Sequence, residues 1–191
     1  MRIIGGKYKG KKLIQPLDKT TRPLKDLVKE SIFNIIQHSN KINFQIENSK
    51  ILDLYAGSGS FGIECISRDA KLVYFFEKHQ NAIKILNQNI NSLKENSNYK
   101  LFEKDCLDFL ASDSFKTKNF NIIFLDPPFK EDTLNKILNL ILSKNILKDD
   151  GLIIIHRHIK DKIKIIDELE IVEDRKYGIS RIFFCKKLKF L

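Results

Sequence analysis

The sequence contains no tryptophan, three cysteines, four prolines and no apolar run long enough to cross a membrane. A membrane-spanning helix needs about 20 consecutive apolar residues, and a secretory signal would be apolar where this N-terminus alternates glycine with basic residues. The cysteines, Cys65, Cys106 and Cys185, are odd in number and widely spaced, which suits neither a disulfide framework nor a zinc site. We therefore expect a soluble, cytoplasmic protein with reduced structural cysteines, no bound metal and no membrane partner.

The length and the charge set broad limits. With 191 residues the chain has the size of one globular domain with a small appendage, and we expect a monomer. The net charge is +10, and residues 1–29 hold nine basic side chains against two acidic ones. A local positive field of this kind attracts phosphate backbones. The alternative is a solvated lysine-rich surface, because charge alone does not identify a nucleic-acid partner.

Strand-like apolar runs alternate with helix-length amphipathic stretches. Residues 81–93, for example, place apolar side chains three and four positions apart, as one buried helical face requires. This alternation predicts an α/β fold, a Rossmann-like doubly wound sheet of seven mostly parallel strands. Residues 169–177 and 179–187 have no helix between them, which predicts an antiparallel C-terminal hairpin at one sheet edge. The other expected strands cover residues 51–54, 72–76, 99–102, 120–125 and 152–155.

The N-terminal part differs in pattern from the rest. Residues 2–13 are basic and interrupted by glycine, which predicts a short hairpin, and Thr21-Arg22-Pro23 is typical of a helix entry. We therefore divide the chain into a basic hairpin-and-helix extension, residues 1–45, expected to contact RNA, and an α/β domain, residues 46–191.

The strongest local motif is Ile51-Leu-Asp-Leu-Tyr-Ala-Gly-Ser-Gly-Ser-Phe-Gly62, an apolar strand that leads into a glycine-rich turn and then a helix. Its glycines allow the backbone to approach a cofactor closely, but their spacing also fits a dinucleotide fold. Asp53, a poor strand residue, favours a class I methyltransferase, where an acidic group at this place organises the loop around the amino-acid end of S-adenosylmethionine. A capping or turn aspartate is the alternative.

Two further carboxylates follow the next strands. Glu77 ends the second strand, where it could accept the ribose hydroxyls of an adenosine cofactor, or be a solvated helix-start residue. Asp105 follows the third strand and could meet the adenine amino group, or be an ordinary helix N-cap. The expected cofactor-binding residues are Asp53, Tyr55, Ala56, Gly57, Ser58, Gly59, Gly62, Glu77, Lys78, Asp105, Cys106 and Asp126.

The motif Asp126-Pro127-Pro128-Phe129 directly follows the fourth expected strand. Two prolines stiffen the turn and leave carbonyls free to accept hydrogen bonds. An exocyclic base amine could donate to the Asp126 carboxylate and the Pro127 carbonyl, which would align its lone pair for attack, while Phe129 stacks on the base. These four residues are the expected catalytic residues, and the alternative is a surface turn with a core Phe. Strands 1 and 4 of a doubly wound sheet are neighbours, so we expect this turn to face the glycine loop.

These motifs together resemble those of the RsmD-type guanine-N2 methyltransferases of small-subunit ribosomal RNA. The resemblance covers nearly the whole chain, and its most specific parts are Arg2-Ile-Ile-Gly-Gly6 and Thr21-Arg22-Pro23 with the helix up to Asn34. It implies S-adenosylmethionine as cofactor, ribosomal RNA or the small ribosomal subunit as partner, and Phe33 and Asn34 near the cofactor. The expected RNA-binding residues are Arg2, Lys7, Lys9, Lys11, Arg22 and Lys29.

One segment departs from the family pattern. The fifth expected strand ends in His156-Arg157-His158, where members of the family often carry Val-Glu-x-Glu. A histidine makes the site more positive, and we interpret His156 as a neutral surface or strand-end residue whose contact with substrate is open.

The expected reaction is methyl transfer from S-adenosylmethionine to the N2 amine of a guanosine in 16S ribosomal RNA, by direct displacement. No cysteine nucleophile is needed, because an amine attacks by itself once it is aligned. Two alternatives remain. An adenine-N6 methyltransferase of DNA or RNA would use the same motifs, and a non-catalytic RNA-binding ribosome assembly factor could share the scaffold.

Overall fold

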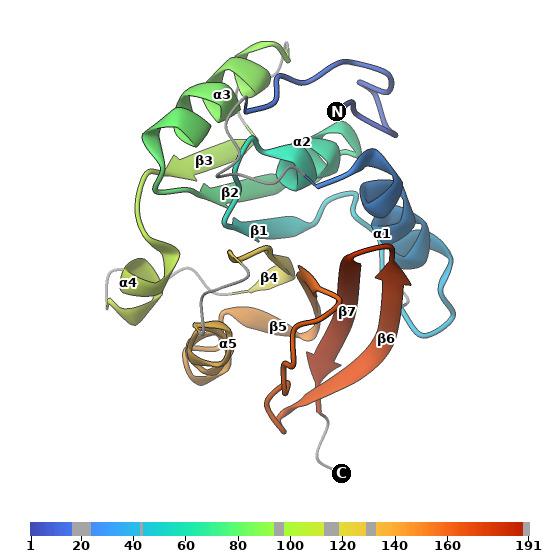
Figure 1. Cartoon of the computed structure of the whole chain (residues 1–191), viewed down its shortest axis with the longest axis vertical. Helices are drawn as coiled ribbons and strands as arrows, with labels where there is room; N and C mark the ends of the chain where they lie inside the picture. Colours follow the sequence, from blue (N-terminus) through green and yellow to red (C-terminus); the bar gives the residue numbers. More distant parts are fainter. Residues whose placement is uncertain (17–23, 43, 94–97, 113–118, 129–132, 189–191) are drawn as a thin grey trace.

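A seven-stranded sheet with helices on both faces forms the centre of the computed structural model (Figure 1). The structure describes residues 1–16, 24–42, 44–93, 98–112, 119–128 and 133–188. The strand order is β3-β2-β1-β4-β5-β7-β6, parallel up to β5 and antiparallel for the β5–β7 and β7–β6 pairs. The strands are β1 (Lys50–Leu54), β2 (Leu72–Phe76), β3 (Tyr99–Phe102), β4 (Phe120–Leu125), β5 (Leu147–His158), β6 (Leu169–Tyr177) and β7 (Ser180–Lys187). The predicted fold class is confirmed.

Alternate side chains of the central strands enter two separate cores. On β1, Ile51 packs into one core and Leu52 into the other, as the two-residue period of a strand requires. Helices α1, α2 and α3 cover the first face, and α4 and α5 cover the second (Figure 1). The helices are α1 (Asp26–His38), α2 (Ser60–Ser67), α3 (Gln80–Asn91), α4 (Cys106–Ala111) and α5 (Leu134–Ser143).

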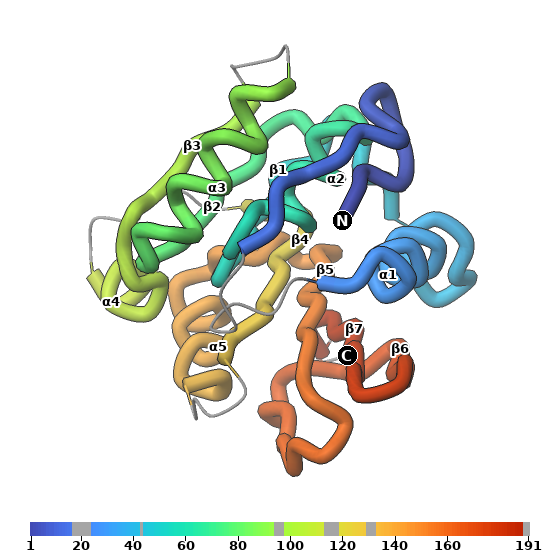
Figure 2. The backbone as a smooth tube through the Cα atoms, turned by 45° about the horizontal axis from the view of Figure 1, so that its top comes forward, coloured from blue at the N-terminus to red at the C-terminus, as the bar shows by residue number. Residues whose placement is uncertain are grey.

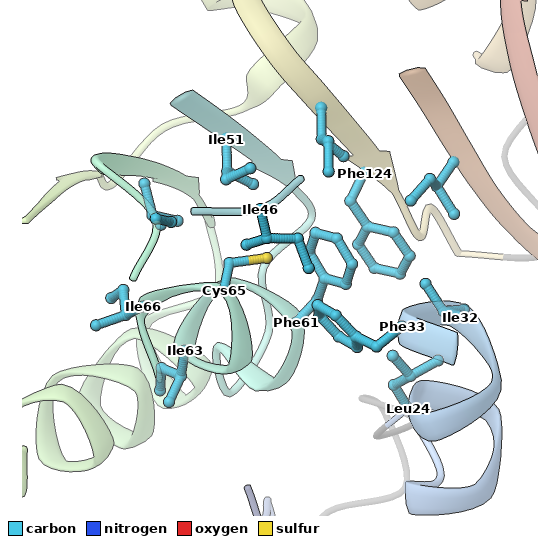
Figure 3. Close-up of a cluster of buried hydrophobic side chains, with 14 of the residues drawn as sticks. Leu24, Ile32, Phe33, Ile46, Ile51, Phe61, Ile63, Cys65, Ile66 and Phe124 are labelled. Atoms are coloured by element: carbon cyan, nitrogen blue, oxygen red, sulfur yellow. The ribbon is translucent and has the colours of Figure 1, made fainter. Parts of the chain in front are cut away.

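An aromatic stack fixes α1 against the sheet. The ring of Phe33 stacks on Phe61 of α2 at 5.3 Å, and Phe61 stacks on Phe124 of β4 at 4.1 Å between ring centroids (Figure 3). Phe33 is fully buried in this stack, whereas the next residue, Asn34, is exposed. The role of Phe33 in the structure is therefore to join α1 to the core of the α/β domain.

Hydrogen bonds join the N-terminal segment first to α2 and then to α3. Arg2 pairs with Lys12 as an antiparallel bridge, which agrees with the expected hairpin. The segment then runs across α2, as Figures 1 and 2 both show. The N–H groups of Ile4 and Gly5 donate to the Glu64 carboxylate at 2.7 Å each. The extension therefore shares one packed core with the α/β domain.

A buried ion pair reinforces this attachment. Glu64 and Lys29 both have fully buried side chains, and their charged atoms lie 3.7 Å apart. Burial lowers the pKa of Lys29, and the neighbouring Glu64 and Asp26 carboxylates oppose that shift. Arg68 adds a second cation, whose Nε donates to Glu64 at 3.0 Å.

Three further findings concern the sequence expectations. Among the described residues, no helix is long and apolar enough to cross a membrane. In the same part of the chain, no group of three or more His, Cys, Asp or Glu side chains is arranged to hold a metal ion. Cys65, Cys106 and Cys185 are buried and free. The expected helix entry at residues 21–23 lies outside the described residues.

We predict that Glu64→Gln lowers the free energy of unfolding by about 3–5 kcal/mol, because it removes the buried countercharge of the Lys29 ammonium and leaves only the partly exposed Asp26 nearby. Urea denaturation monitored by circular dichroism measures the change. Glu47→Gln, at an exposed position, is the matched control and should unfold like the unmodified protein. Equal stability of the Glu64 and Glu47 variants would contradict a structural role for the buried pair.

Candidate functional site

The predicted neighbours β1 and β4 are paired in parallel, so their carboxyl ends meet at one edge of the sheet. Asp53 lies opposite Phe124 in this register, and Leu54 lies opposite Leu125. The turn that follows Leu125 therefore starts beside the glycine loop that follows Leu54, as expected from the motifs.

Asp53 is a buried carboxylate at this edge, with only 1% of the residue exposed. Its Oδ2 accepts the N–H of Gly62 in the first turn of α2 at 3.0 Å. Its Oδ1 is buried and has no hydrogen-bond partner in the described part of the chain. Burial raises the pKa of Asp53 well above its ordinary value, the Gly62 N–H opposes that shift, and the charges of Asp126 and Glu77 add to it. The site therefore holds an acidic group that lacks a positive partner.

The glycine loop is bound to the end of β2. Tyr55, Gly57 and Gly59 all have positive φ values, of 64°, 55° and 82°. For Tyr55 this backbone conformation is strained, a feature that clusters at functional sites. The Gly57 N–H donates to Glu77 Oε2 at 2.8 Å, and a Cβ added at Gly57 would meet no atom within 4 Å. The loop thus presents open backbone on one side.

Glu77 is already engaged by backbone donors. Besides Gly57, the N–H groups of Lys78 and His79 donate to its Oε1 at 2.9 and 2.8 Å. A carboxylate has roughly four acceptor positions. One acceptor position of the Glu77 carboxylate therefore remains. The sequence had suggested that Glu77 accepts both ribose hydroxyls of the cofactor.

The remaining expected cofactor residues lie near the same edge. Asp105 caps α4 by accepting the Leu107 N–H at 2.9 Å, and its other oxygen pairs with Lys78 at 2.8 Å. Burial raises the pKa of Asp105, but the hydrogen bonds from Lys78 and the Leu107 N–H outweigh it and lower the pKa overall. Asp105 is therefore a helix N-cap, as the alternative interpretation expected, through one carboxylate oxygen, and its other oxygen forms an ion pair. Ala56, Ser58 and Cys106 are buried.

Asp126 is held by His156, whose contacts the strand pattern did not predict. The Asp126 Oδ1 and the His156 Nδ1 are 2.8 Å apart, and the His156 Nε2 lies 2.9 Å from the Ser180 Oγ. His156 is 4% exposed and lies two residues before the end of β5, so it is a strand-end residue and not a surface residue. Its position follows from the strand register, in which Leu125 lies opposite Ile155, so that His156 comes beside Asp126.

The diproline turn is held from the same strand. Arg157 Nη1 donates to the carbonyls of Pro127 at 3.5 Å and Pro128 at 3.3 Å. Asp161 forms an ion pair with Arg157, in which its Oδ2 lies 3.0 Å from the Arg157 Nε. Phe129 lies outside the described residues, so its expected stacking on a base stays a prediction.

The expected RNA-binding residues divide into exposed and buried ones. Arg2, Lys7 and Lys9 are exposed, and Lys11 is partly buried and donates to the Ser92 carbonyl. Arg22 lies outside the described residues. Lys29 corrects the expectation, because its ammonium is fully buried and donates to the Arg2 carbonyl at 2.6 Å and to Ser60 Oγ at 3.3 Å. In this position it neutralises Glu64 and is not available to an RNA phosphate.

Comparison with known proteins assigns the chain to a family. The family model described as conserved hypothetical protein 95 matches residues 1–186. The chain belongs to this family. The ribosomal RNA small subunit methyltransferase D of Haemophilus influenzae is 36% identical over 163 residues, covering 85% of this chain and 80% of that protein. YlbH of Bacillus subtilis, named as a candidate rRNA methyltransferase, is 32% identical over 188 residues, covering 98% of this chain and 99% of that protein. The structure of the methyltransferase candidate yhhF from Escherichia coli matches with a TM-score of 0.83 at 28% identity, covering 98% of this chain and 97% of that chain.

These similarities confirm the RsmD-type resemblance, which implies S-adenosylmethionine as the methyl donor. The described residues fit this cofactor. S-adenosylmethionine carries a positive sulfonium and an ammonium group, and the buried Asp53 Oδ1 lacks any partner in the described chain. A cation next to Asp53 would relieve both the unmade hydrogen bond and the repulsion from Asp126 and Glu77.

We predict that cofactor binding releases a proton through Asp53. Because the pKa of Asp53 is raised in the free protein, part of the population carries a proton that a cationic ligand expels. The affinity for S-adenosylmethionine should therefore fall as the pH drops through that raised pKa. Calorimetric titrations in two buffers with different ionisation enthalpies measure the released proton.

The control is Asp53→Asn, which should bind the cofactor more weakly and release no proton. Binding heats that do not depend on the buffer at any pH in the acid-to-neutral range would contradict this role of Asp53.

Proposed function

We propose that the protein transfers a methyl group from S-adenosylmethionine to the exocyclic N2 amine of a guanosine in small-subunit ribosomal RNA. The observation that carries the proposal is the state of the Asp126 carboxylate. Its Oδ1 is engaged by His156, while its Oδ2 accepts no hydrogen bond in the described part of the chain. Relatives of this chain include small-subunit ribosomal RNA methyltransferases, which supports the choice of RNA.

In this proposal, oxygen atoms that accept hydrogen bonds activate the exocyclic amine of the base. The lone pair of an exocyclic base amine is delocalised into the ring, so its direction matters for attack. The Asp126 Oδ2 and the Pro127 carbonyl would each accept one N–H, which favours a tetrahedral nitrogen whose lone pair is less conjugated with the ring and points toward the methyl group. The carbonyl of Pro127 keeps a second lone pair beside its 3.5 Å contact with Arg157.

When bound, S-adenosylmethionine supplies a methyl group made electrophilic by the sulfonium. Asp53 would hold the amino-acid end of this cofactor, Glu77 one ribose hydroxyl, and the open backbone at Gly57 the nearby atoms. After transfer the amine carries an extra proton, and Asp126 would accept it. No covalent bond to the protein forms in this scheme.

The RNA contact is proposed for the N-terminal extension, residues 1–45, and the methyl transfer for residues 46–191. The exposed side chains of Arg2, Lys7 and Lys9 supply the positive surface. Lys7 also pairs with Asp69 at 3.1 Å, an exposed contact that a phosphate could replace.

We predict that Asp126→Ala lowers the rate of methyl transfer at least about 100-fold and leaves cofactor binding nearly unchanged. In a strain that lacks this protein, ribosomal RNA should lose one N2-methylguanosine. The unmodified protein and the exposed-site control Asp149→Asn should restore it, and Asp126→Ala should not. Nucleoside mass spectrometry measures the modified base.

If the deletion strain instead loses N6-methyladenosine, the methylated base is adenine and not guanine. An unchanged nucleoside profile together with undetectable cofactor binding would favour the non-catalytic assembly factor.

We predict that the triple substitution Arg2→Gln, Lys7→Gln and Lys9→Gln weakens RNA binding and flattens its salt dependence. The slope of log K against log salt should become shallower by about 0.7–0.9 for each phosphate that is no longer neutralised. Charge substitutions are preferable to a deletion, because Ile3 and Leu13 are buried in the core.

A control with the same change in net charge substitutes the exposed lysines Lys136, Lys162 and Lys164 by Gln. Titration of RNA at several salt concentrations compares the two proteins. The same slope for both would show that the N-terminal segment is not the RNA contact.

A further inference from the structure

Strand β5 extends past the end of β4 and flanks the diproline turn. Leu125, the last residue of β4, lies opposite Ile155, and β5 continues to His158. Its next two side chains contact the turn in different ways. His156 reaches the Asp126 carboxylate, and Arg157 reaches the carbonyls of the two prolines.

Strand parity places His156 on the same side of the sheet as the cofactor loop. Ile154 of β5, Phe124 of β4 and Ile182 of β7 all belong to the core beneath α1 and α2. His156 follows Ile154 by two residues, so its side chain leaves the same face. Ser180 precedes Ile182 by two residues on the antiparallel partner and reaches the far side of the same imidazole ring.

The two contacts determine the protonation pattern of the ring. An ionised Asp126 only accepts hydrogen bonds, so the His156 Nδ1 must carry the hydrogen and donate it at 2.8 Å. In the neutral ring Nε2 is then the acceptor, and the Ser180 hydroxyl donates to it at 2.9 Å. Ser180 is itself 5% exposed, which excludes most competition from solvent.

We propose that His156 is a positioning residue for methyl transfer, which holds Asp126 by Oδ1 so that Oδ2 is presented to the substrate amine, with Ser180 fixing the imidazole. This inference rests on the proposed function and adds a residue to it. The terminal torsion of an aspartate side chain is broad. An Asp126 without this contact would sample orientations in which neither oxygen meets the amine.

Four variants test the arrangement. His156→Phe keeps a ring but removes both ring nitrogens, and His156→Asn keeps an N–H near the position of Nδ1. Ser180→Ala removes the second partner without touching Asp126. His158→Asn is the matched control, because His158 lies two residues further along β5, where its Nδ1 accepts the Lys160 N–H.

The kinetic expectation is a selective loss of turnover. His156→Phe should lower kcat by about 10- to 100-fold, as expected for a misplaced reacting group, with the KM for RNA and the Kd for S-adenosylmethionine changed less than about twofold. His156→Asn should recover most of that loss, and His158→Asn should behave like the unmodified protein. Full kcat in His156→Phe, or cofactor binding that weakens in parallel with kcat, would overturn the proposal.

A second measurement is independent of the substrate. Nitrogen-15 NMR of the histidine rings in the free protein should show His156 as the Nδ1–H tautomer, or as the doubly protonated ring. Ser180→Ala should shift the His156 signals, as should Asp126→Asn, while the His158 signals stay in place. A predominant Nε2–H tautomer at His156, or signals indifferent to Asp126→Asn, would overturn the inference.

The two measurements separate the two proposals. If the unmodified protein modifies no guanosine, the proposed function fails, and the NMR result still decides whether His156 holds Asp126. If guanosine is methylated but the His156 signals do not change in Asp126→Asn, only the positioning role fails.

Discussion

The buried carboxyl of Asp53, at the joint end of β1 and β4, is the constraint on which the proposed site depends. Asp53 is buried with one oxygen unpartnered, and the charge of Asp126 helps to raise its pKa. A buried carboxyl oxygen without a hydrogen-bond partner lowers stability, because it loses its contacts with water and gains none in return. This cost is offset if a positively charged ligand binds beside Asp53 and donates a hydrogen bond to its free oxygen. The cationic methyl donor of the proposed function would meet that requirement.

The N-terminal segment and the site depend on the same helix. Glu64 of α2 binds the backbone of Ile4 and Gly5, while the first turn of α2 donates to Asp53. Lys29 links this network to the glycine loop through Ser60. We therefore expect that a displacement of the basic segment would also shift the glycine loop, because short contacts through α2 and Lys29 connect the two. The segment is thus both a positively charged surface and a structural part of the site.

Much of the fold could be predicted because buried faces of strands and helices require apolar residues at regular spacings in the sequence. The bounds of β2 and β4 agree with the expected runs, since these strands are largely apolar on both faces, and the bounds of β3 agree although its Lys100 is exposed. The start of β5 was missed, because exposed Asp149 and Asp150 interrupt its apolar pattern before Gly151.

Two residues of the site could not be placed from the sequence for a different reason. Lys29 was counted with the basic surface, and only its buried partner Glu64, 35 positions further along the chain, shows that it is internal. His156 depends on the register between β4 and β5, which pattern alone does not give. A signal for Lys29 did exist, since it shares a helical face with Val28, Ile32 and Phe33, which are also buried.

The free cysteines give the molecule a reporter on each side of its sheet. Cys65 lies in the core beneath α1 and α2, and Cys185 in the core beneath α4 and α5. Burial raises the pKa of Cys65 well above its ordinary value and that of Cys185 to about 12, so both stay as unreactive thiols while their layer is closed. Alkylation of each thiol would then proceed only when its own layer opens, and the two rates would show whether the halves of the protein loosen together or one before the other.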